Sequence, residues 1–486
     1  MSSLTEQTVS GVAWTTIQRF ASLLLAFVAN LILARLLTPD DFGCIGMLMI
    51  FIALSQIFVD GGFGAALIQK KEPTQEDYST IFYWNLVIAL VLYIALFFAA
   101  PLIARFYKIP LLCDILRIQG LVLFLDAVGI VHKNHLRKTL YFKKISLIVI
   151  TANVVAVVIA VYMAYNGYGV WCLVAQQLLI SGVSTLLFWI FNRWRPSVVF
   201  SKQSFKELFS FGSFILLSNT IVTFFNEIQT LIIGKLYTAR DVGLYTQSRK
   251  LESIMSNTSS TVVCQVTFPI FARFQNDLPS LCNILRRITK AMAFFVFPAM
   301  ILVILVAKPA IVLMLTDKWV DCVPYFQILC VGGMAESLSD INYNAVAAIG
   351  KSKVLFRWTC VKSVVGLLLI IVGSFFGVRG IVWAVTIRFY LVFLIHASLA
   401  AHYLNFNFFV QMKDLFQIAL IALTAGACSY FVGVKVLTLA NMYYLALTEI
   451  IVFLISYFLI TYLFNRPMFS EVKYIVNTII HKRQSA

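Results

Sequence analysis

Charge is scarce in this sequence of 486 residues. Only 12% of the residues are Asp, Glu, Lys or Arg, whereas about 25% is usual in soluble domains. Hydrophobic residues make up 61%, and they form continuous runs instead of the alternating pattern of a transmembrane β-strand. The scarcity of charge excludes an ordinary soluble domain, and the runs predict an all-α polytopic membrane protein.

Metal-binding and catalytic patterns are missing too. The chain has only 5 His, and its 9 Cys are scattered without a CxxC pair or a Cys/His cluster, so no metal site is predicted. The segment Gly61-Gly62-Phe63-Gly64 lacks the Lys-Ser/Thr of a nucleotide-binding P-loop, and no strand precedes it. No hydrolase or transferase constellation appears. We therefore expect a protein that is not an enzyme, with no catalytic residues and no cofactor.

Long polar loops are absent, so no extramembrane domain is expected between the apolar segments. With about 20 residues for each span, the sequence predicts about fourteen transmembrane helices. The expected spans lie near 13–34, 43–67, 81–104, 115–131, 145–165, 168–191, 209–233, 243–268, 288–307, 323–346, 354–376, 379–400, 414–434 and 442–464.

The net charge of +17 comes mainly from the loops. Lys and Arg concentrate in alternate loops, for example at 133–144 and 193–206, as the positive-inside rule requires. A membrane therefore explains the charge better than nucleic acid does. The pattern places both termini in the cytoplasm. The N-terminal segment lacks a basic start and leads into a full-length span, so we interpret it as an uncleaved first helix.

One motif occurs twice in the chain. The segment 33–43 ends the first apolar run and opens the next, and the segment 233–243 does the same later, with a basic residue, Leu, Thr, Asp and Gly recurring in register. We interpret this as a duplication that gives two six-helix bundles, related by a pseudo-twofold axis along the membrane normal, and two additional C-terminal helices. The expected domains are an N-terminal bundle at 1–191, a basic cytoplasmic linker at 192–208, a second bundle at 209–400, two extra helices at 401–464 and a cytoplasmic tail at 465–486.

Polar side chains inside the spans are candidates for a substrate cavity, because they usually face a cavity or each other. The first span carries Gln18 and Arg19. The span that opens the second bundle carries a stripe at three- and four-residue spacing, made of Asn219, Thr223, Asn226 and Glu227. Hydrogen bonds between helices would explain the same residues.

Two further arginines lie at bilayer depth. Arg249 belongs to the polar helix 243–268, which would not pass as a span alone and could instead lie at the membrane interface. Arg388 lies in the helix 379–400. We count both among the candidates for the cavity, as cations that could meet an anionic group.

Three acidic residues are candidates for binding a coupling ion. Glu336 and Asp340 lie one turn apart in the helix 323–346, and Asp126 is the repeat partner of Asp340. Such groups could bind H⁺ or Na⁺, or they could neutralise nearby arginines.

Several stretches resemble bacterial polysaccharide flippases, which handle O-antigen, capsule or exopolysaccharide units. The most specific is Ala34-Arg35-Leu36-Leu37-Thr38-Pro39-Asp40-Asp41-Phe42-Gly43, followed by Ala66-Leu67-Ile68-Gln69-Lys70-Lys71. Weaker ones are Gly243-Leu244-Tyr245, Phe268-Pro269 and the segment 344–351. These flippases belong to the multidrug/oligosaccharidyl-lipid/polysaccharide (MOP) exporter superfamily, whose other branches include lipid II flippases and MATE drug exporters.

The resemblance implies that two bundles enclose a cavity and carry an undecaprenyl-diphosphate-linked oligosaccharide from the cytoplasmic to the periplasmic leaflet by alternating access. Arg19 resembles the cavity arginine in the first helix of such flippases. The implied partners are the lipid-linked substrate, membrane lipid, and polysaccharide polymerase and assembly proteins. Two alternatives stay open. One is a cation-coupled exporter of small amphipathic molecules, like the MATE branch. The other is a membrane glycosyltransferase, polymerase or ligase, which usually needs a larger loop.

Overall fold

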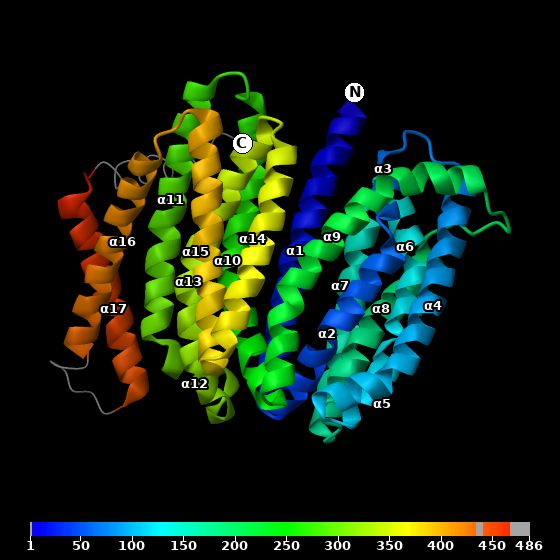
Figure 1. The fold of residues 1–486 in the computed structure, drawn as a ribbon, viewed down its shortest axis with the longest axis horizontal. Coiled ribbons are helices and arrows are strands. Elements are labelled where there is room, and N and C mark those ends of the chain that lie inside the picture. The colour runs from blue at the N-terminus through cyan, green and yellow to red at the C-terminus, as the bar shows by residue number, and fades with distance from the viewer. Residues whose placement is uncertain (1, 434–440, 467–486) are drawn as a thin grey trace. The chain divides into compact units, whose positions relative to one another are not determined.

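The computed structural model describes residues 2–433 and 441–466. Within these residues every regular element is a helix (Figure 1), which confirms the all-α class. From residue 467 onward, the expected tail lies outside the described residues. The chain divides into two compact units, Met1–Thr246 and Gln247–Ala486. The two units are defined by the contacts within each of them, whereas the expected domain boundaries follow the repeat in the sequence. Those boundaries stay a prediction.

Unit 1 is built from long helices that pack along one another. α1 packs on α7, α7 on α8, α8 on α6 and α6 on α4, whereas α9 lies against α2, α3 and α4. In Figure 1, α9 first runs across one end of this unit and then turns along it. The helices are α1 (Ser2–Leu36), α2 (Pro39–Asp60), α3 (Phe63–Gln69), α4 (Gln75–Tyr107), α5 (Leu111–Gln119), α6 (Val122–Lys138), α7 (Phe142–Tyr165), α8 (Trp171–Phe191) and α9 (Lys202–Leu236), and α10 (Ala239–Arg273) continues into unit 2.

A pair of glycines divides the expected span 43–67 into α2 and α3. Gly61 and Gly62 have φ values of 59° and 73°, a left-handed conformation that glycine adopts without a steric penalty. A Cβ at Gly62 would also collide with the carbonyl of Gly212 in α9. The glycines therefore permit both the break and the close approach of α9.

The duplicated motif forms the same helix start twice. At α2, the hydroxyl of Thr38 accepts a hydrogen bond from the Asp41 amide, while the Asp41 carboxylate accepts one from the Thr38 amide. Thr238 and Asp241 make the same pair of bonds at the start of α10, at 3.1 and 3.2 Å. Each pair is a capping box, which satisfies amide groups that the first turn of a helix leaves without partners.

The two copies of this motif also contact each other within unit 1. A Cβ at Gly43 would collide with the carbonyl of Ala239, and a Cβ at Gly243 would collide with the carbonyl of Pro39. Ala239 occupies the position of Pro39 in the repeat, so the contact is reciprocal. The glycine of each copy lets the two helix starts cross backbone to backbone.

Unit 2 has α13 at its centre. α13 packs against α11 and α15, α15 packs against α14, and α16 packs against α11 and α17. The hydroxyl of Tyr457 on α17 donates a hydrogen bond to the carbonyl of Phe294 on α11, at 2.9 Å. This bond connects α17 to the rest of the unit. The elements are α11 (Leu278–Leu305), α12 (Ala307–Leu315), the 3₁₀ helix η1 (Asp317–Cys322), α13 (Val323–Ala348), α14 (Ser352–Ser374), α15 (Gly377–Leu404), α16 (Phe408–Phe431) and α17 (Met442–Phe464).

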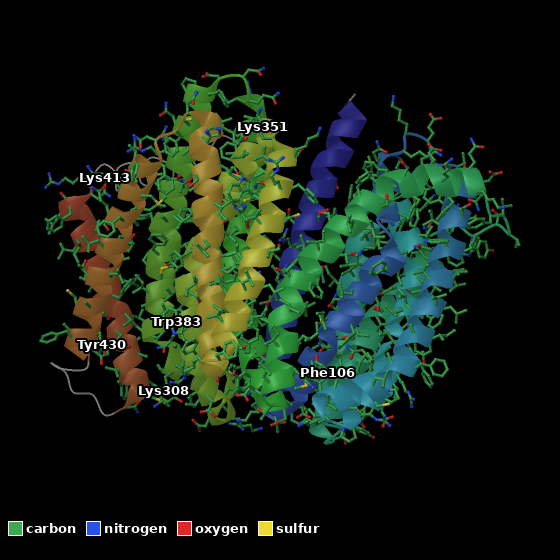
Figure 2. All side chains as sticks on the ribbon, viewed as in Figure 1. Phe106, Lys308, Lys351, Trp383, Lys413 and Tyr430 are labelled. Carbon is green, nitrogen blue, oxygen red and sulfur yellow. The ribbon has the colours of Figure 1, made fainter. Side chains whose placement is uncertain are left out.

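Labelled side chains mark the two ends of unit 2 in Figure 2. Lys351 and Lys413 lie toward one end and Lys308 toward the other, while Trp383 and Tyr430 lie nearer the Lys308 end. Both of these aromatic side chains are exposed. Exposed Trp and Tyr near helix ends are typical of a membrane–water interface.

Eleven of the described helical segments are long and apolar enough to cross a membrane, which makes this a multi-pass membrane protein. Three of the expected spans, 115–131, 243–268 and 323–346, are not among the eleven. The first is broken between α5 and α6, and α6 has only 17 residues and ends in a basic run. The other two carry charged side chains within the helix, on α10 and α13.

Candidate functional site

Charged residues of α10 and α13 form a network within unit 2. Arg249 donates to Glu336 through both terminal nitrogens, at 2.8 and 3.0 Å, and it also pairs with Glu252 one turn along α10. The ring of Phe389 on α15 lies 4.7 Å from the guanidinium carbon. The structure therefore brings together two predicted residues, Arg249 and Glu336, and adds Glu252, which the sequence analysis did not select.

The other acidic candidate of unit 2 lies one turn beyond Glu336. The Asp340 side chain is exposed, and Lys362 of α14 lies within electrostatic range of it. Lys362 is also 3.3 Å from Nε2 of His396, a buried residue of α15. Asp340 is thus part of a set of charges that includes cations, and its role as an ion-binding group stays a prediction.

Arg388 lies half-buried on α15 beside the same aromatic ring that Arg249 contacts. Its guanidinium carbon is 5.4 Å from the centroid of Phe389. A Cβ at Gly366 of α14 would lie 2.6 Å from its side-chain Cδ, so this glycine makes room for the arginine. Arg249 and Arg388 therefore share one aromatic contact, and their role toward a substrate stays a prediction.

Gln18 and Arg19 are neighbours on α1 with different surroundings. Gln18 is half-buried and accepts a hydrogen bond from the hydroxyl of Ser146 on α7, at 3.4 Å. This is the bond between helices that the sequence analysis left open as an alternative. The side chain of Arg19 is exposed, which leaves its guanidinium accessible to an anionic group.

The predicted stripe on α9 is partly accessible. Asn219 and Asn226 are exposed, whereas Thr223 and Glu227 are half-buried. These four side chains recur at spacings of four, three and one residues, so they follow one side of the helix. A helix in a membrane gains nothing from exposing amides to lipid, which supports the prediction that this side meets water or polar groups.

Asp126 of α6 has polar neighbours within unit 1. Its carboxylate accepts a hydrogen bond from the side-chain amide of Gln56 on α2, at 2.8 Å. Lys133 lies within electrostatic range of both Asp126 and Asp60. The basic run 133–144 predicts that Lys133 lies in a loop, but Lys133 belongs to α6 and is only partly exposed. Its spacing of seven residues from Asp126, two helical turns, was the signal that could have indicated this.

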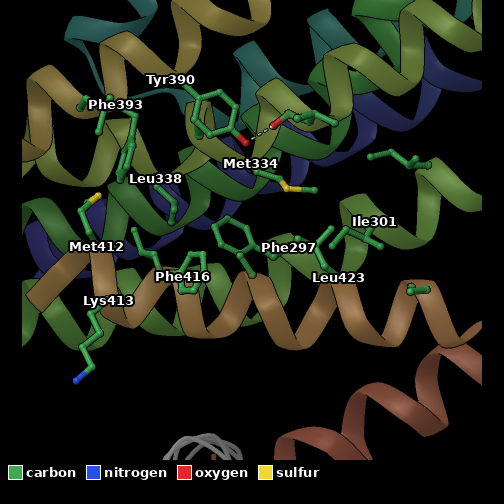
Figure 3. Close-up of a pocket in the computed structure, with 18 of the residues that line it drawn as sticks. Phe297, Ile301, Met334, Leu338, Tyr390, Phe393, Met412, Lys413, Phe416 and Leu423 are labelled. Atoms are coloured by element: carbon green, nitrogen blue, oxygen red, sulfur yellow. Dashed lines mark hydrogen bonds between the residues drawn. The ribbon is translucent and has the colours of Figure 1, made fainter. Parts of the chain in front are cut away.

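A long apolar cavity of about 1010 Å³ lies within unit 2. Figure 3 shows Phe297, Leu338 and Phe416 pointing into it from three different helices, and Lys413 at one end with its amino group pointing away. The lining is almost wholly aliphatic and aromatic, and comes from α11, α13, α15 and α16. The hydroxyl of Tyr390 donates to the carbonyl of Val331, at 3.1 Å, and so does not add a free polar group. Such a cavity suits a hydrocarbon chain and not a sugar.

The arrangement supports ion pairing, proton binding and contact with anions. In the part of the chain that the structure describes, no three His, Cys, Asp or Glu side chains are grouped to hold a metal ion.

A family described as "Polysaccharide biosynthesis protein" matches residues 32–324, more than half of the chain. The chain belongs to this family. The match begins two residues before the motif Ala34–Gly43 and ends at the start of α13. It therefore includes both copies of the capping motif. Membership confirms the resemblance on which the sequence analysis relied.

Relatives along most of the chain carry the names of bacterial polymer biosynthesis. The Teichuronic acid biosynthesis protein TuaB of Bacillus subtilis (strain 168) is 28% identical over 441 residues, which are 90% of this chain and 91% of the relative. The Succinoglycan biosynthesis transport protein ExoT of Rhizobium meliloti (strain 1021) is 26% identical over 379 residues, 76% of each chain. This family member thus aligns with these relatives over three quarters or more of their length.

The fold is similar to that of a solved flippase. The Lipid II flippase MurJ in an inward closed conformation superposes with a TM-score of 0.77 at 16% identity, covering 94% of this chain and 100% of that one. At this identity the likeness establishes the fold of this family member and nothing further.

Proposed function

We propose that this protein moves undecaprenyl-diphosphate-linked oligosaccharide repeat units from the cytoplasmic to the periplasmic leaflet of a bacterial inner membrane, for polysaccharide biosynthesis. The observation that carries the proposal is the family match over residues 32–324. The printed names of TuaB and ExoT, one of them a transport protein, and the fold of a lipid II flippase support it. In this proposal the protein is a transporter without cofactor or catalytic residues, and not an enzyme.

The physical problem explains why such a step needs a protein. A diphosphate and several sugars lose many hydrogen bonds in hydrocarbon, so they need a polar path, while the lipid chain is stable in an apolar one. Unit 2 offers both kinds of surface, the Arg249 network and the apolar cavity next to α16. We propose that the cavity accommodates part of the lipid chain during transport.

The proposed architecture has fourteen spans, in two six-helix bundles related by a pseudo-twofold axis along the membrane normal and two extra helices. The reciprocal contact of Gly43 and Gly243 supports the internal symmetry, because corresponding atoms meet across it. The domain boundaries at 191, 208, 400 and 464, both termini in the cytoplasm, and alternating access belong to this proposal. The polysaccharide polymerase and assembly proteins are proposed partners, and nucleic acid is not.

We propose Arg19 as a ligand of the diphosphate. Arginine binds phosphate oxygens through charged hydrogen bonds, and this side chain is exposed on α1. Gln18, the α9 stripe, Arg249 and Arg388 are proposed as further parts of the substrate path.

The proposed function is tested in a deletion strain by mass spectrometry of its lipid-linked intermediates. We expect the lipid-linked repeat unit to accumulate on the cytoplasmic leaflet and to return to the wild-type level when the gene is restored. Unchanged lipid-linked sugars together with increased sensitivity to amphipathic drugs would contradict the proposal and favour a MATE-like exporter.

Substitution of Arg19 tests its role in that assay. We expect Arg19→Ala to reduce export by roughly tenfold at normal abundance in the membrane, since one charged hydrogen bond contributes about 1.5–3 kcal/mol. Arg19→Lys should be milder because it keeps the charge. Arg105→Ala, which removes another exposed arginine at the end of α4, serves as the control. Normal export by Arg19→Ala would remove the diphosphate role.

A further inference from the structure

We propose that Glu252 and Glu336 share one proton within unit 2, and that its uptake and release are coupled to transport. The proton site stands on the geometry of α10 and α13 alone. The coupling rests on the proposed function, and the experiment below separates the two.

The numbers of positive and negative charges in the cluster of Arg249, Glu252 and Glu336 indicate that one of the two carboxyl groups carries a proton. One guanidinium, that of Arg249, serves two carboxylates, so it can neutralise only one of them. Glu252 is fully buried, and its Oε1 has no hydrogen-bond partner among the described residues. An ionised oxygen that is both buried and unpaired is strongly disfavoured. A proton on this carboxyl group removes the excess negative charge.

The surroundings of Glu252 suit a neutral acid. A Cβ at Gly333 of α13 would collide with Oε1 of Glu252 and would lie 3.1 Å from the methyl group of Met300 on α11. The glycine thus creates the space that the carboxyl group fills, and the apolar methyl group of Met300 lies beside the same glycine. The thiol of Cys330 on α13 is a further titratable group that faces Glu252.

The charged groups around the pair come from three helices. On α10 and α13 they are Arg249 and Glu336, and on α15 the guanidinium carbon of Arg388 lies 5.4 Å from the centroid of the Phe389 ring. Asp340 follows one turn beyond Glu336, and Lys362 of α14 lies within electrostatic range of Asp340. The cation that contacts Glu252 directly is therefore Arg249.

Glu336 provides the route between this proton and water. Its side chain is 21% exposed, against 0% for Glu252, and the hydroxyl of Ser256 lies 3.5 Å from its Oε2. A hydronium ion gives its proton to Glu336 and becomes water. The proton passes to Glu252, and Arg249 then pairs fully with the carboxylate that remains ionised. Release returns the proton to water by the reverse steps, and no other bond changes.

Infrared difference spectroscopy of the purified full-length protein in lipid nanodiscs tests the proton site without any transport assay. Between neutral and alkaline buffer, in both of which exposed carboxylates stay ionised, we expect the C=O stretch of a protonated carboxylic acid to be present at first and then to disappear in the wild type. Glu252→Gln should abolish this band and Glu336→Gln should shift its titration. Asp340→Asn, which changes an exposed carboxylate one turn away on α13, should retain it. A band that survives Glu252→Gln or vanishes in Asp340→Asn would overturn the proposal.

Thermal stability provides a second test that does not depend on spectral assignment. If Glu252 is protonated, the neutral isostere in Glu252→Gln should unfold at the wild-type temperature or above at neutral pH. If Glu252 is instead an ionised partner of Arg249, the same variant should unfold at a lower temperature, which would contradict the proposal.

Export at several pH values then tests the coupling. We expect Glu252→Gln to flatten the pH dependence of lipid-linked oligosaccharide export. A lost infrared band with an unchanged pH profile would overturn the coupling and leave the proton site intact. Failure of the wild type itself to export lipid-linked oligosaccharide would overturn the proposed function and not the site.

Discussion

His132 shows how its surroundings fix the charge state of a single side chain in unit 1. It lies on α6 beyond the expected span and is fully buried, with ring centroids 4.5 Å from Trp189 and 5.0 Å from Trp194. Burial, assisted by the nearby charge of Arg195, lowers the pKa of His132 from 6.5 to about 4. The folded protein therefore holds this imidazole neutral at every physiological pH.

This burial predicts a loss of stability in acid. At pH 5 the unfolded chain binds a proton at His132 and the folded chain does not, so stability that is complete above pH 6.5 declines as the pH falls toward 4. From the cited pKa values, the loss between pH 7 and pH 5 is roughly 2 kcal/mol. We expect His132→Phe to remove this part of the acid sensitivity in thermal unfolding of the purified protein. His402→Phe, at an exposed histidine of α15, should leave it unchanged, and equal acid sensitivity in His132→Phe would contradict the argument.

Charged residues in the spans show what the sequence could and could not predict about the site. The sequence identified Arg249 and Glu336 as costly charges that need partners, and they are indeed partners of each other. The sequence did not identify Glu252, because Glu252 follows Arg249 by one turn. This spacing is typical of an ordinary salt bridge along a helix surface. Its full burial depends on Gly333, which lies 81 positions further along the chain.

At the scale of elements, helix starts were easier to predict than helix breaks. The capping pattern at Thr38 and Thr238 has a local cause, and the structure has both caps. The break at Gly61 was missed because hydrophobic residues resume at Phe63, directly after Asp60-Gly61-Gly62. The start of α9 was placed too late, since the segment after Ser201 is polar. Tertiary contacts make this segment helical, among them the ion pair of Glu207 with Lys70 at 3.0 Å.

The crossing of α2 and α10 gives a prediction at this scale. A methyl group at Gly43 has no space beside the carbonyl of Ala239, so the helix starts must separate to admit it. We expect Gly43→Ala to destabilise the protein by about 1–3 kcal/mol, the usual range for overpacking, and Gly243→Ala to do the same because the contact is reciprocal. Gly182→Ala is the matched control, since a Cβ there would meet Leu125 at an ordinary 3.6 Å. Equal melting temperatures for Gly43→Ala and Gly182→Ala would show that the crossing is not tight.

At the scale of the whole molecule, the number of spans decides the topology. Eleven segments qualify as spans by length and apolar character alone, and an odd number would place the two termini on opposite sides. The proposed fourteen spans place them on the same side. The difference lies in α10 and α13, whose charges lower their hydropathy, and in the α5–α6 pair, which is broken into two short helices. Arg249 of α10 pairs with Glu336 of α13 and with Glu252 of α10, which lowers the penalty of placing these three charges in the bilayer.

Reporter fusions at the two termini can therefore distinguish these arrangements. We expect a fluorescent protein that matures only in the cytoplasm to be bright at either end, and alkaline phosphatase, which is active only in the periplasm, to be inactive at either end. The physical reason is that a charged helix inserts when its charges find partners in a neighbouring helix, as Arg249 does in Glu336. Opposite results at the two termini would mean that an odd number of helices crosses, so that at least one of the three segments α10, α13 and α5–α6 lies outside the bilayer.

The variant Glu336→Leu tests whether pairing between helices holds α10 in the membrane. It removes the partner of Arg249 on α13, leaves its partner Glu252 on α10, and makes α13 more apolar. If pairing is what holds α10 in the membrane, reporters placed after α10 should change sides in a fraction of the molecules, whereas an unchanged pattern would show that α10 crosses without this partner.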